Sequence, residues 1–250
     1  MAGTALLGRL SWRLGEVVEI TAETPRVSSV ALAVPGWPGH LPGQHVDVRL
    51  TAEDGYQAQR SYSIANPALG ERVVLTVEEI PDGEVSPFLV GELMVGDRFE
   101  LRGPVGGYFV WEPPDGGPLQ LVAGGSGVVP LMSMIRANAA TPDPVPTKLL
   151  YSARAPEDLI YRPELEELAG DRLEVTYALT RSRPAGLAAY DRRVDRAILE
   201  EATSPPGDLP RIFVCGPTGF VETVADTLVA IGHQPDRVKT ERFGPTGGSS

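Results

Sequence analysis

The fold of this chain is decided by Arg60-Ser61-Tyr62-Ser63-Ile64-Ala65-Asn66, read together with Gly124-Gly125-Ser126-Gly127. In a β-strand, the first stretch would present a cation and an aromatic ring on one face and two hydroxyls on the other. The second stretch leaves an apolar run through three glycines, so its backbone amides are open to a phosphate group at a strand-to-helix turn. The two stretches therefore predict two halves with different ligand chemistry.

Composition and charge narrow the class of protein. The chain has 250 residues, enough for one or two domains of about 150 residues each. Its 33 acidic and 22 basic residues give a net charge of −11, so its field should repel nucleic acid and anionic membranes. The longest mostly apolar run, 119–135, is broken by glycines and polar residues and falls short of a bilayer span. We expect a cytoplasmic protein with no nucleic-acid partner and no membrane partner.

The chain has one cysteine, Cys215, and three scattered histidines. A single thiol excludes an internal disulfide and a four-cysteine iron–sulfur cluster within this sequence. The histidines do not show metal-ligand spacing, so we expect no metal site. If electrons leave this protein, a separate partner must accept them.

The first half of the chain reads as short β-segments separated by turn residues such as Pro42-Gly43 and Asp82-Gly83. Six segments carry β-branched or alternating apolar residues: Gly15–Ile20, Val27–Val34, His45–Leu50, Ser61–Ala65, Val73–Glu79 and Arg98–Arg102. Strands at this spacing predict a closed antiparallel β-barrel.

The clearest linker is Pro113-Pro114-Asp115-Gly116-Gly117-Pro118, which predicts two domains, 1–113 and 118–250. Beyond the linker, predicted strands over 119–123, 148–152, 173–179, 211–215 and 238–242 alternate with predicted helices over 128–139, 163–168, 194–202 and 220–231. This alternation predicts an α/β domain with a parallel sheet, right-handed crossovers and ligands at the carboxyl ends of the strands.

Four motifs, in this order along the chain, resemble the ferredoxin-NADP reductase family of flavoproteins. They are the Arg-x-Tyr-Ser segment 60–63, Gly83-Glu84-Val85-Ser86, the glycine turn 124–127, and Cys215-Gly216-Pro217 with Glu241-Arg242-Phe243. The match spans nearly the whole chain. The resemblance implies an FAD-binding β-barrel followed by an NAD(P)-binding α/β domain.

By this resemblance, Arg60 contacts the flavin diphosphate, Tyr62 packs on the isoalloxazine ring, and Ser63 approaches the reactive N5 atom. A guanidinium suits a phosphate through paired donors, and aromatic stacking adds about 0.5–1.5 kcal/mol beyond the buried area. An exposed arginine and a core tyrosine in an ordinary strand are the alternative reading. The other residues that the resemblance implies for FAD are Ile64, Val77, Gly83, Val85, Ser86 and Phe243.

The Gly83-to-Ser86 turn is expected to open a short helix, with Ser86 as its cap and Pro87 at its first position. The free amides of such a helix could hold the second phosphate of FAD. The same residues would also make a capped helix without a ligand, and both readings can be true together.

On the nicotinamide side, the glycine turn offers Gly125, Ser126 and Gly127 to a diphosphate. The residues that follow the next two predicted strands are Ser152, Arg154, Thr180 and Arg181, and their cations could neutralise the 2′-phosphate of NADP. NADPH is therefore favoured over NADH.

The resemblance also implies roles near the carboxyl terminus. Cys215, followed by Gly216 and Pro217, would lie beside the nicotinamide C4 atom, although a buried small hydrophobe explains a lone cysteine equally well. Phe243 would shield the other face of the flavin, and Glu241 would support hydride or proton traffic.

The expected activity is that of an FAD-dependent NAD(P)H oxidoreductase, with Ser63, Cys215 and Glu241 as its catalytic residues. Its electrons would pass to a separate carrier, such as a ferredoxin, or to another redox enzyme. Two alternatives stay open. One is a flavin or ferric reductase for which the flavin is a diffusing substrate, and the other is an electron-transfer subunit of a larger complex without independent turnover.

Overall fold

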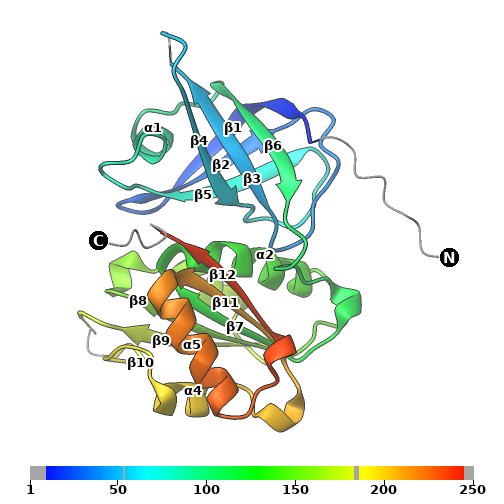
Figure 1. Ribbon diagram of the computed structural model, residues 1–250, viewed down its shortest axis with the longest axis vertical. Helices are drawn as coiled ribbons and strands as arrows, with labels where there is room; N and C mark the ends of the chain where they lie inside the picture. The colour runs from blue at the N-terminus through cyan, green and yellow to red at the C-terminus, as the bar shows by residue number, and fades with distance from the viewer. Residues whose placement is uncertain (1–9, 53, 183–185, 245–250) are drawn as a thin grey trace, which may run out of the picture.

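The computed structural model describes residues 10–52, 54–182 and 186–244. They form an antiparallel sheet built from the first half of the chain and a parallel sheet built from the second half. Figure 1 shows the two sheets as separate layers, with the helix α2 (Val128–Ala139) between them. The two-part architecture predicted from the sequence is confirmed. The exact bounds 1–113 and 118–250 stay a prediction, and the terminal parts 1–9 and 245–250 lie outside the described residues.

The first sheet has six strands in the order β4-β3-β6-β1-β2-β5. Their bounds are β1 Trp12–Thr24, β2 Val27–Ala33, β3 His45–Thr51, β4 Gln57–Ser63, β5 Arg72–Glu78 and β6 Arg98–Val105. An antiparallel bridge between Ile64 and Leu75 joins the two edge strands, so the sheet closes into the predicted barrel. Alternate side chains of the strands, including Val46, Val48 and Leu101, are fully buried and form the barrel core.

A short helix, α1 (Ser86–Gly91), follows the turn after β5, and it corrects one prediction. Ser86 does not cap this helix but is its first residue, and Val85 stands at the cap position without a side-chain hydrogen bond. The Ser86 hydroxyl instead accepts a hydrogen bond from the backbone N–H of Ile80 at 3.0 Å. A serine has one short side chain, and here it closes the preceding turn rather than the helix.

The second sheet has six parallel strands in the order β10-β9-β8-β7-β11-β12. Their bounds are β7 Leu119–Gly124, β8 Thr147–Ala153, β9 Leu173–Leu179, β10 Ala189–Tyr190, β11 Arg211–Pro217 and β12 Val238–Phe243. The remaining α-helices are α3 Arg162–Leu168, α4 Arg196–Ala202 and α5 Thr218–Ala230, and the 3-10 turns are η1 Pro113–Asp115, η2 Gly125–Gly127, η3 Pro156–Asp158, η4 Pro206–Asp208 and η5 Pro235–Arg237. The sequence did not predict the two-residue strand β10.

Helices cover both faces of this parallel sheet, so its central strands are continuous apolar runs. Leu121 and Ala123 of β7 pack with α2 and α3, whereas Val122 of the same strand packs with α4 and α5. Figure 1 shows α4 and α5 on the side of the sheet that faces the viewer. The strand order changes direction between β7 and β11, so this sheet has its topological switch point there.

Three hydrogen bonds, two buried and one part-buried, fix the barrel to the parallel sheet. In α2, the Ser133 hydroxyl donates to the Asn66 carbonyl at 3.0 Å, and an Arg136 N–H donates to the Ala65 carbonyl at 2.7 Å. Just before α3, the Tyr161 hydroxyl bonds to the Thr76 hydroxyl of β5. Ala65 and Asn66 directly follow β4, so the helix that starts at the glycine turn is tied to the strand that carries Arg60 and Tyr62.

The predicted linker is anchored rather than loose. The Trp111 indole N–H donates to the Gly116 carbonyl at 3.0 Å, and the Trp111 side chain is fully buried. Glu112 and Asp115 cap the turn η1 reciprocally. The connection between the sheets therefore has a defined course.

Within the described ranges, no helix combines the length and the hydropathy needed to cross a membrane. The cytoplasmic location expected from the sequence stays a prediction.

Candidate functional site

A cleft of about 800 Å³ lies between the barrel and the carboxyl edge of the parallel sheet. Its barrel side is lined by residues of β4, of β5 and of the turn that precedes α1. Its other side is lined by the residues at the ends of β7, β8, β9, β11 and β12. A single cleft thus joins the barrel to the topological switch point of the second sheet, which is where α/β folds bind their ligands.

The barrel wall of the cleft is built from β4. The register pairs Arg60 with Val48 and Tyr62 with Val46, so these side chains share one face of the strand. Tyr62 is half-buried at the end of the barrel core, and burial raises the pKa of its phenol to about 12. Ser63 lines the cleft beside it. The end of β4 therefore offers the cleft an aromatic side chain that stays protonated, followed in the chain by a hydroxyl.

Arg60 is not free in this structure, because its guanidinium donates to the Glu84 carboxylate at 2.7 Å. The other oxygen of Glu84 accepts a hydrogen bond from the Tyr56 hydroxyl at 2.5 Å. Arg60 and Glu84 both line the cleft, and the side chains of both are about half exposed. The cation predicted for a diphosphate therefore has an anion beside it.

The turn before α1 forms the end of the barrel wall. Gly83, Val85 and Ser86 all line the cleft. A Cβ at Gly83 would lie 2.9 Å from the Ile80 carbonyl oxygen, so this turn is too tight for a larger residue. The structure brings these three predicted residues to the same cleft as Arg60.

The glycine turn forms the floor of the cleft on the opposite side. Gly125 has φ +56°, a left-handed conformation that glycine adopts without strain, and it lines the cleft with Ser126. Gly127 is buried, and a Cβ there would lie 2.2 Å from the Cys215 carbonyl oxygen. The aromatic ring of Phe220 packs against Gly124 and would clash with a side chain at that position. Two of these four residues are therefore glycine because neighbouring protein atoms leave no room for a side chain.

The ends of β8 and β9 supply polar groups to the cleft. Ser152, Arg154 and Thr180 line it, whereas Arg181 does not. Among the residues that the structure describes, none forms a hydrogen bond or ion pair with the exposed Arg154 guanidinium. Arg154 is therefore a cation that an incoming anion meets without competition from a described acid.

The ends of β11 and β12 complete the cleft. Pro217 and Phe243 line it, and they are paired in register across the two strands. Cys215 is buried beneath them, and burial raises the pKa of its thiol, with a smaller contribution from the negative charge of Glu241. Burial therefore favours the neutral form of this thiol.

Glu241 is paired in register with Cys215. One of its carboxyl oxygens, Oε2, is buried and has no hydrogen-bond partner among the described residues. Burial raises the pKa of this carboxyl from 4.5 to about 7. Glu241 can therefore hold or release a proton near neutral pH, two residues before Phe243, which lines the cleft.

Several predicted site residues do not line the cleft. Ile64 and Val77 are core residues of the barrel, so their side chains pack inside it. The others that do not line it are Gly127, Arg181, Cys215, Gly216 and Glu241. The roles that the sequence suggested for all of these residues stay predictions.

Sequence reasoning also missed some residues of the cleft. Glu84 lies inside a quoted motif, but nothing in the sequence indicates that it pairs with Arg60. Phe220 was interpreted only as a helix residue, although it lines the cleft. Arg26 lines the cleft as well and lies 3.7 Å from Glu78. Only the tertiary structure brings these side chains to the same place.

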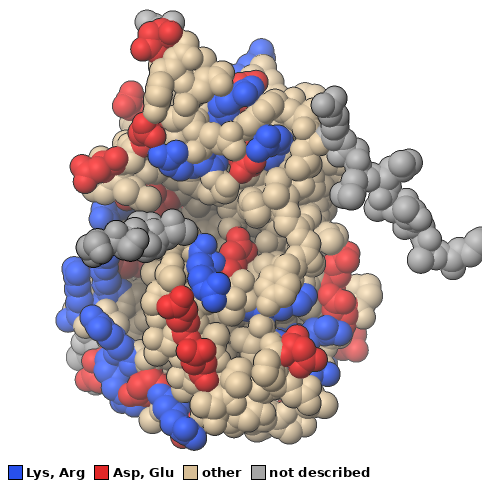
Figure 2. Space-filling view, viewed as in Figure 1, with Lys and Arg blue, Asp and Glu red and all other residues tan. Residues whose placement is uncertain are grey.

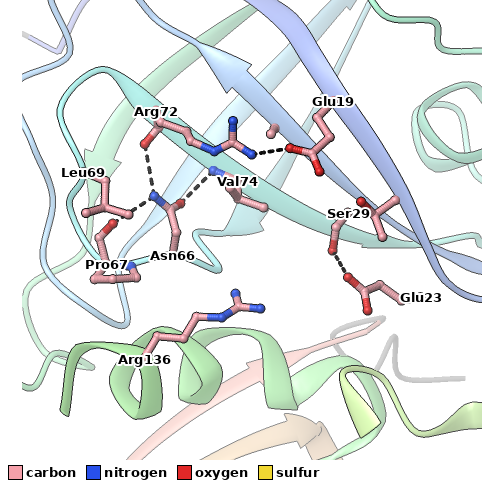
Figure 3. A pocket seen from close by; sticks show the side chains of 11 residues that line it. Glu19, Glu23, Ser29, Asn66, Pro67, Leu69, Arg72, Val74 and Arg136 are labelled. Atoms are coloured by element: carbon pink, nitrogen blue, oxygen red, sulfur yellow. Dashed lines mark hydrogen bonds and ion pairs between the residues drawn. The ribbon is translucent and has the colours of Figure 1, made fainter. Parts of the chain in front are cut away.

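A second pocket, of about 410 Å³, lies between β1, β2, β5 and α2. Figure 3 shows its charged groups in pairs, with Arg72 bonded to Glu19 and Glu23 bonded to Ser29. Arg136 points into the pocket from α2 but binds Glu164 and the Ala65 carbonyl. These side chains bind groups of the protein itself. The pocket is therefore part of the junction between the two sheets.

The surface has no field of a single sign on the face seen in Figure 2, where acidic and basic side chains are interspersed. The cleft itself carries Arg26, Arg60 and Arg154 against Glu78, Glu84 and Asp158. Binding of a ligand with several phosphates must therefore depend on local contacts rather than on the net charge of the protein.

The donor set of the cleft fits two nucleotides. The half-buried Tyr62 offers an aromatic ring for a flat ligand on the barrel side, with the Arg60 guanidinium next to it. On the other side, Gly125 and Ser126 offer backbone amides and a hydroxyl, and Arg154 offers a cation. Phosphates, hydroxyl groups and flat aromatic rings are the partners that suit these groups.

Comparison with protein families agrees with this division. Residues 15–110 match the family described as the oxidoreductase FAD-binding domain, and residues 121–226 match the oxidoreductase NAD-binding domain. The first match covers the barrel, and the second covers the parallel sheet from β7 into α5.

Known proteins with the same two parts are similar to this chain. It is 35% identical to the glycine betaine monooxygenase reductase subunit of Chromohalobacter salexigens over 82% of this chain and 56% of that protein. A solved ferredoxin reductase in carbazole 1,9a-dioxygenase has a TM-score of 0.81 and 27% identity, over 96% of this chain and 71% of that chain. The FAD/NAD binding domain of nitric oxide dioxygenase from Vibrio cholerae shares the fold, with a TM-score of 0.81 and 24% identity over 93% of this chain and 99% of that chain.

The chain spans 56% of the length of the curated reductase subunit that it matches. The two domain matches lie in sequence on a barrel and a parallel sheet whose shared cleft carries the Arg-x-Tyr-Ser segment and the glycine turn. On this combination of matches, fold and motif order, the chain belongs to the ferredoxin-NADP reductase family of flavoproteins.

Proposed function

We propose that this protein is an FAD-dependent reductase that takes electrons from NAD(P)H and passes them to a separate redox partner. One observation carries the proposal. A single cleft brings the β4 face with Arg60, Tyr62 and Ser63 together with the carboxyl ends of β7, β8, β9 and β11. A protein that moved electrons between two bound nucleotides would need this juxtaposition.

On the barrel side, Arg60 would bind the flavin diphosphate, and the Tyr62 ring would pack on the flavin ring. The Ser63 hydroxyl would meet the reactive edge of that ring. When bound, FAD and NAD(P)H supply hydride transfer from nicotinamide C4 to flavin N5 and the later release of single electrons. The protein contributes orientation and electrostatics, and the high pKa of Tyr62 keeps that side chain neutral throughout.

On the sheet side, the amides and hydroxyl of Gly125 and Ser126 would bind the nicotinamide dinucleotide. Phe243 stands at the mouth of the cleft with 36% of its surface exposed, so it can cover a flat ring or give way to one. Glu241 would hold a proton beneath the cleft at neutral pH, because burial raises its pKa to about 7. Cys215 would fill the space below the nicotinamide as a neutral thiol.

NADPH is proposed as the better donor because Arg154 lines the cleft without a described partner. Replacing Arg154 by glutamine should lower the ratio of kcat/KM for NADPH to that for NADH about tenfold, since an exposed charge-assisted bond to the 2′-phosphate would be lost. The matched control is Arg172→Gln, which removes the same charge from an exposed residue that stands before β9 and does not line the cleft. An unchanged ratio in the Arg154 variant would assign the preference to another group.

The proposed electron acceptor is a separate oxygenase or ferredoxin component. This part of the proposal is supported by the names of similar proteins, which include a monooxygenase reductase subunit and electron transfer components of 2-halobenzoate and toluate 1,2-dioxygenases. Mixing the reduced protein with candidate carriers from the same cell, and following their absorbance, identifies the acceptor.

The central test is anaerobic titration of the FAD-reconstituted protein with NADPH and with NADH. The protein should be yellow after reconstitution, and its flavin absorbance should bleach with one equivalent of reductant. A colourless protein, or a yellow one that neither nucleotide bleaches, would refute the proposal.

A second candidate function is favoured by one observation, the pairing of Arg60 with Glu84. A flavin or ferric reductase that uses flavin as a diffusing substrate would release it readily, and an anion beside the diphosphate site would promote release. Turnover of added FMN or riboflavin by a protein that keeps no flavin on a desalting column would support this second function.

A further inference from the structure

We propose that Glu84 limits the affinity of this protein for FAD by competing with the flavin diphosphate for Arg60. This inference rests on the proposed function, because it takes Arg60 as the diphosphate ligand. Glu84 would then set how strongly the cleft discriminates between flavins with and without phosphate.

The carboxylate of Glu84 already occupies Arg60. One guanidinium nitrogen of Arg60 donates to Glu84 at 2.7 Å, and another donates to the Gln59 carbonyl at 2.7 Å. Two terminal nitrogens are therefore engaged before any phosphate arrives. A phosphate that is to make the usual paired contact with a guanidinium must displace Glu84 or accept a poorer geometry.

Glu84 is also held in this position from its other side. The Tyr56 hydroxyl donates to its second oxygen at 2.5 Å. The backbone on either side is closed by a hydrogen bond from the Gly83 N–H to the Ile80 carbonyl at 2.8 Å, and by the bond from the Ile80 N–H to Ser86. The carboxylate is thus anchored to the rim of the cleft and is not a freely swinging surface charge.

Glu84 is ionised at neutral pH. The hydrogen bond from Tyr56, followed by that from Arg60, lowers the pKa of its carboxyl below the usual 4.5. A diphosphate brought next to Arg60 therefore meets a full negative charge. Like charges a few ångströms apart at an exposed site repel each other, and this repulsion should appear as a several-fold to tenfold loss of affinity.

The experiment compares Glu84→Gln with the wild-type chain and with Asp82→Asn. Glutamine keeps the shape of the side chain and removes the charge; its carbonyl oxygen can still accept from Arg60, and its amide N–H can donate to the Tyr56 hydroxyl oxygen. Asp82 is exposed in the same turn and does not line the cleft, so its variant removes the same net charge elsewhere. Dissociation constants for FAD and for riboflavin, which has no phosphate, are measured by quenching of flavin fluorescence.

We expect Glu84→Gln to bind FAD about tenfold more tightly than the wild-type protein, and Asp82→Asn to bind FAD within about twofold of wild type. Riboflavin affinity should be the same in all three. Equal or weaker FAD binding by Glu84→Gln would overturn the inference, and weaker binding would show that Glu84 positions Arg60 for the diphosphate. If Glu84→Gln binds both FAD and riboflavin more tightly, Glu84 acts on the flavin ring rather than on the diphosphate. That result would also overturn the inference.

The outcome also separates this inference from the proposed function. If no variant binds FAD at all, the flavin site itself is wrong. If all variants bind FAD with the same affinity and NAD(P)H bleaches them, the proposed function is supported and the proposed role of Glu84 is refuted.

Discussion

Replacement of Gly127 by alanine is expected to lower the free energy of unfolding by about 1–3 kcal/mol and to weaken binding of the nicotinamide nucleotide. The added Cβ would lie 2.2 Å from the Cys215 carbonyl oxygen and 2.8 Å from the Gly216 amide nitrogen. Both are backbone atoms of the central strand β11, so they cannot move aside as a flexible side chain would. Insertion into packed sites of this kind costs about 1–3 kcal/mol and occasionally more.

The effect of Gly127→Ala would come from the clash alone, because Gly127 has φ −61°, which alanine adopts readily. To relieve the clash, the glycine turn must move off the end of β11, and the floor of the cleft moves with it. Urea denaturation measures the stability loss, and the KM for NADPH measures the loss of binding.

The matched control is Gly219→Ala, in the first turn of α5. Nothing lies within 4 Å of a Cβ at Gly219, and this glycine does not have a positive φ. Alanine there should be neutral or stabilising by about 0.4–1 kcal/mol, because it reduces the freedom of the unfolded chain. Equal stabilities of the Gly127 and Gly219 variants would contradict this prediction, because they would show that β11 shifts to accommodate the added Cβ.

The fold could be predicted from the sequence because its local signals agree with one another. Turn residues such as Pro42-Gly43 separate segments with a period of two in the barrel, and continuous apolar runs mark strands that are covered on both faces. The two-residue strand β10 was missed, since two residues carry no period. The length of β1 was underestimated, and a second irregularity in its pairing, between Ala22 and Thr24, interrupts the alternation beyond the predicted end.

The site was less accessible to sequence reasoning, because its chemistry depends on contacts between distant segments. The order of the motifs predicted that Arg60 and the glycine turn face one cleft. It did not reveal that Glu84 pairs with Arg60. Nor could the sequence separate a glycine required by a ligand from one required by packing. Gly125 faces the cleft, whereas Gly127 is a glycine because of the Cys215 carbonyl.

The raised pKa of Glu241 is a further property that only the structure reveals. Its register position beside Cys215 buries one carboxyl oxygen without a partner among the described residues. Burial of an unpaired carboxylate disfavours the charged form, and the pKa of Glu241 rises from 4.5 to about 7. The folded protein therefore keeps a proton there that the unfolded chain loses at lower pH.

The expected result is a stability cost that grows with pH and is removed in Glu241→Gln. Below about pH 4.5 the carboxyl is protonated in both states, so it contributes no penalty. Between about pH 4.5 and about pH 7 the folded state binds more protons than the unfolded state, so stability falls as the pH rises. Above about pH 7 the full penalty is present, of the order of 3 kcal/mol.

Urea denaturation of the wild-type protein and of Glu241→Gln at pH 5 and pH 8 measures this difference. The variant should be only slightly more stable at pH 5 and about 3 kcal/mol more stable at pH 8. Burial lowers the pKa values of His40, His45 and His233, and these groups change stability in the opposite direction, but they are common to both proteins and cancel in the comparison. Glu222→Gln, at an exposed position of α5, is the control for removal of a carboxylate charge elsewhere. A stability difference that is the same at both pH values would mean that Glu241 is ionised in the folded protein, and such a group could not hold a proton for the proposed reaction at neutral pH.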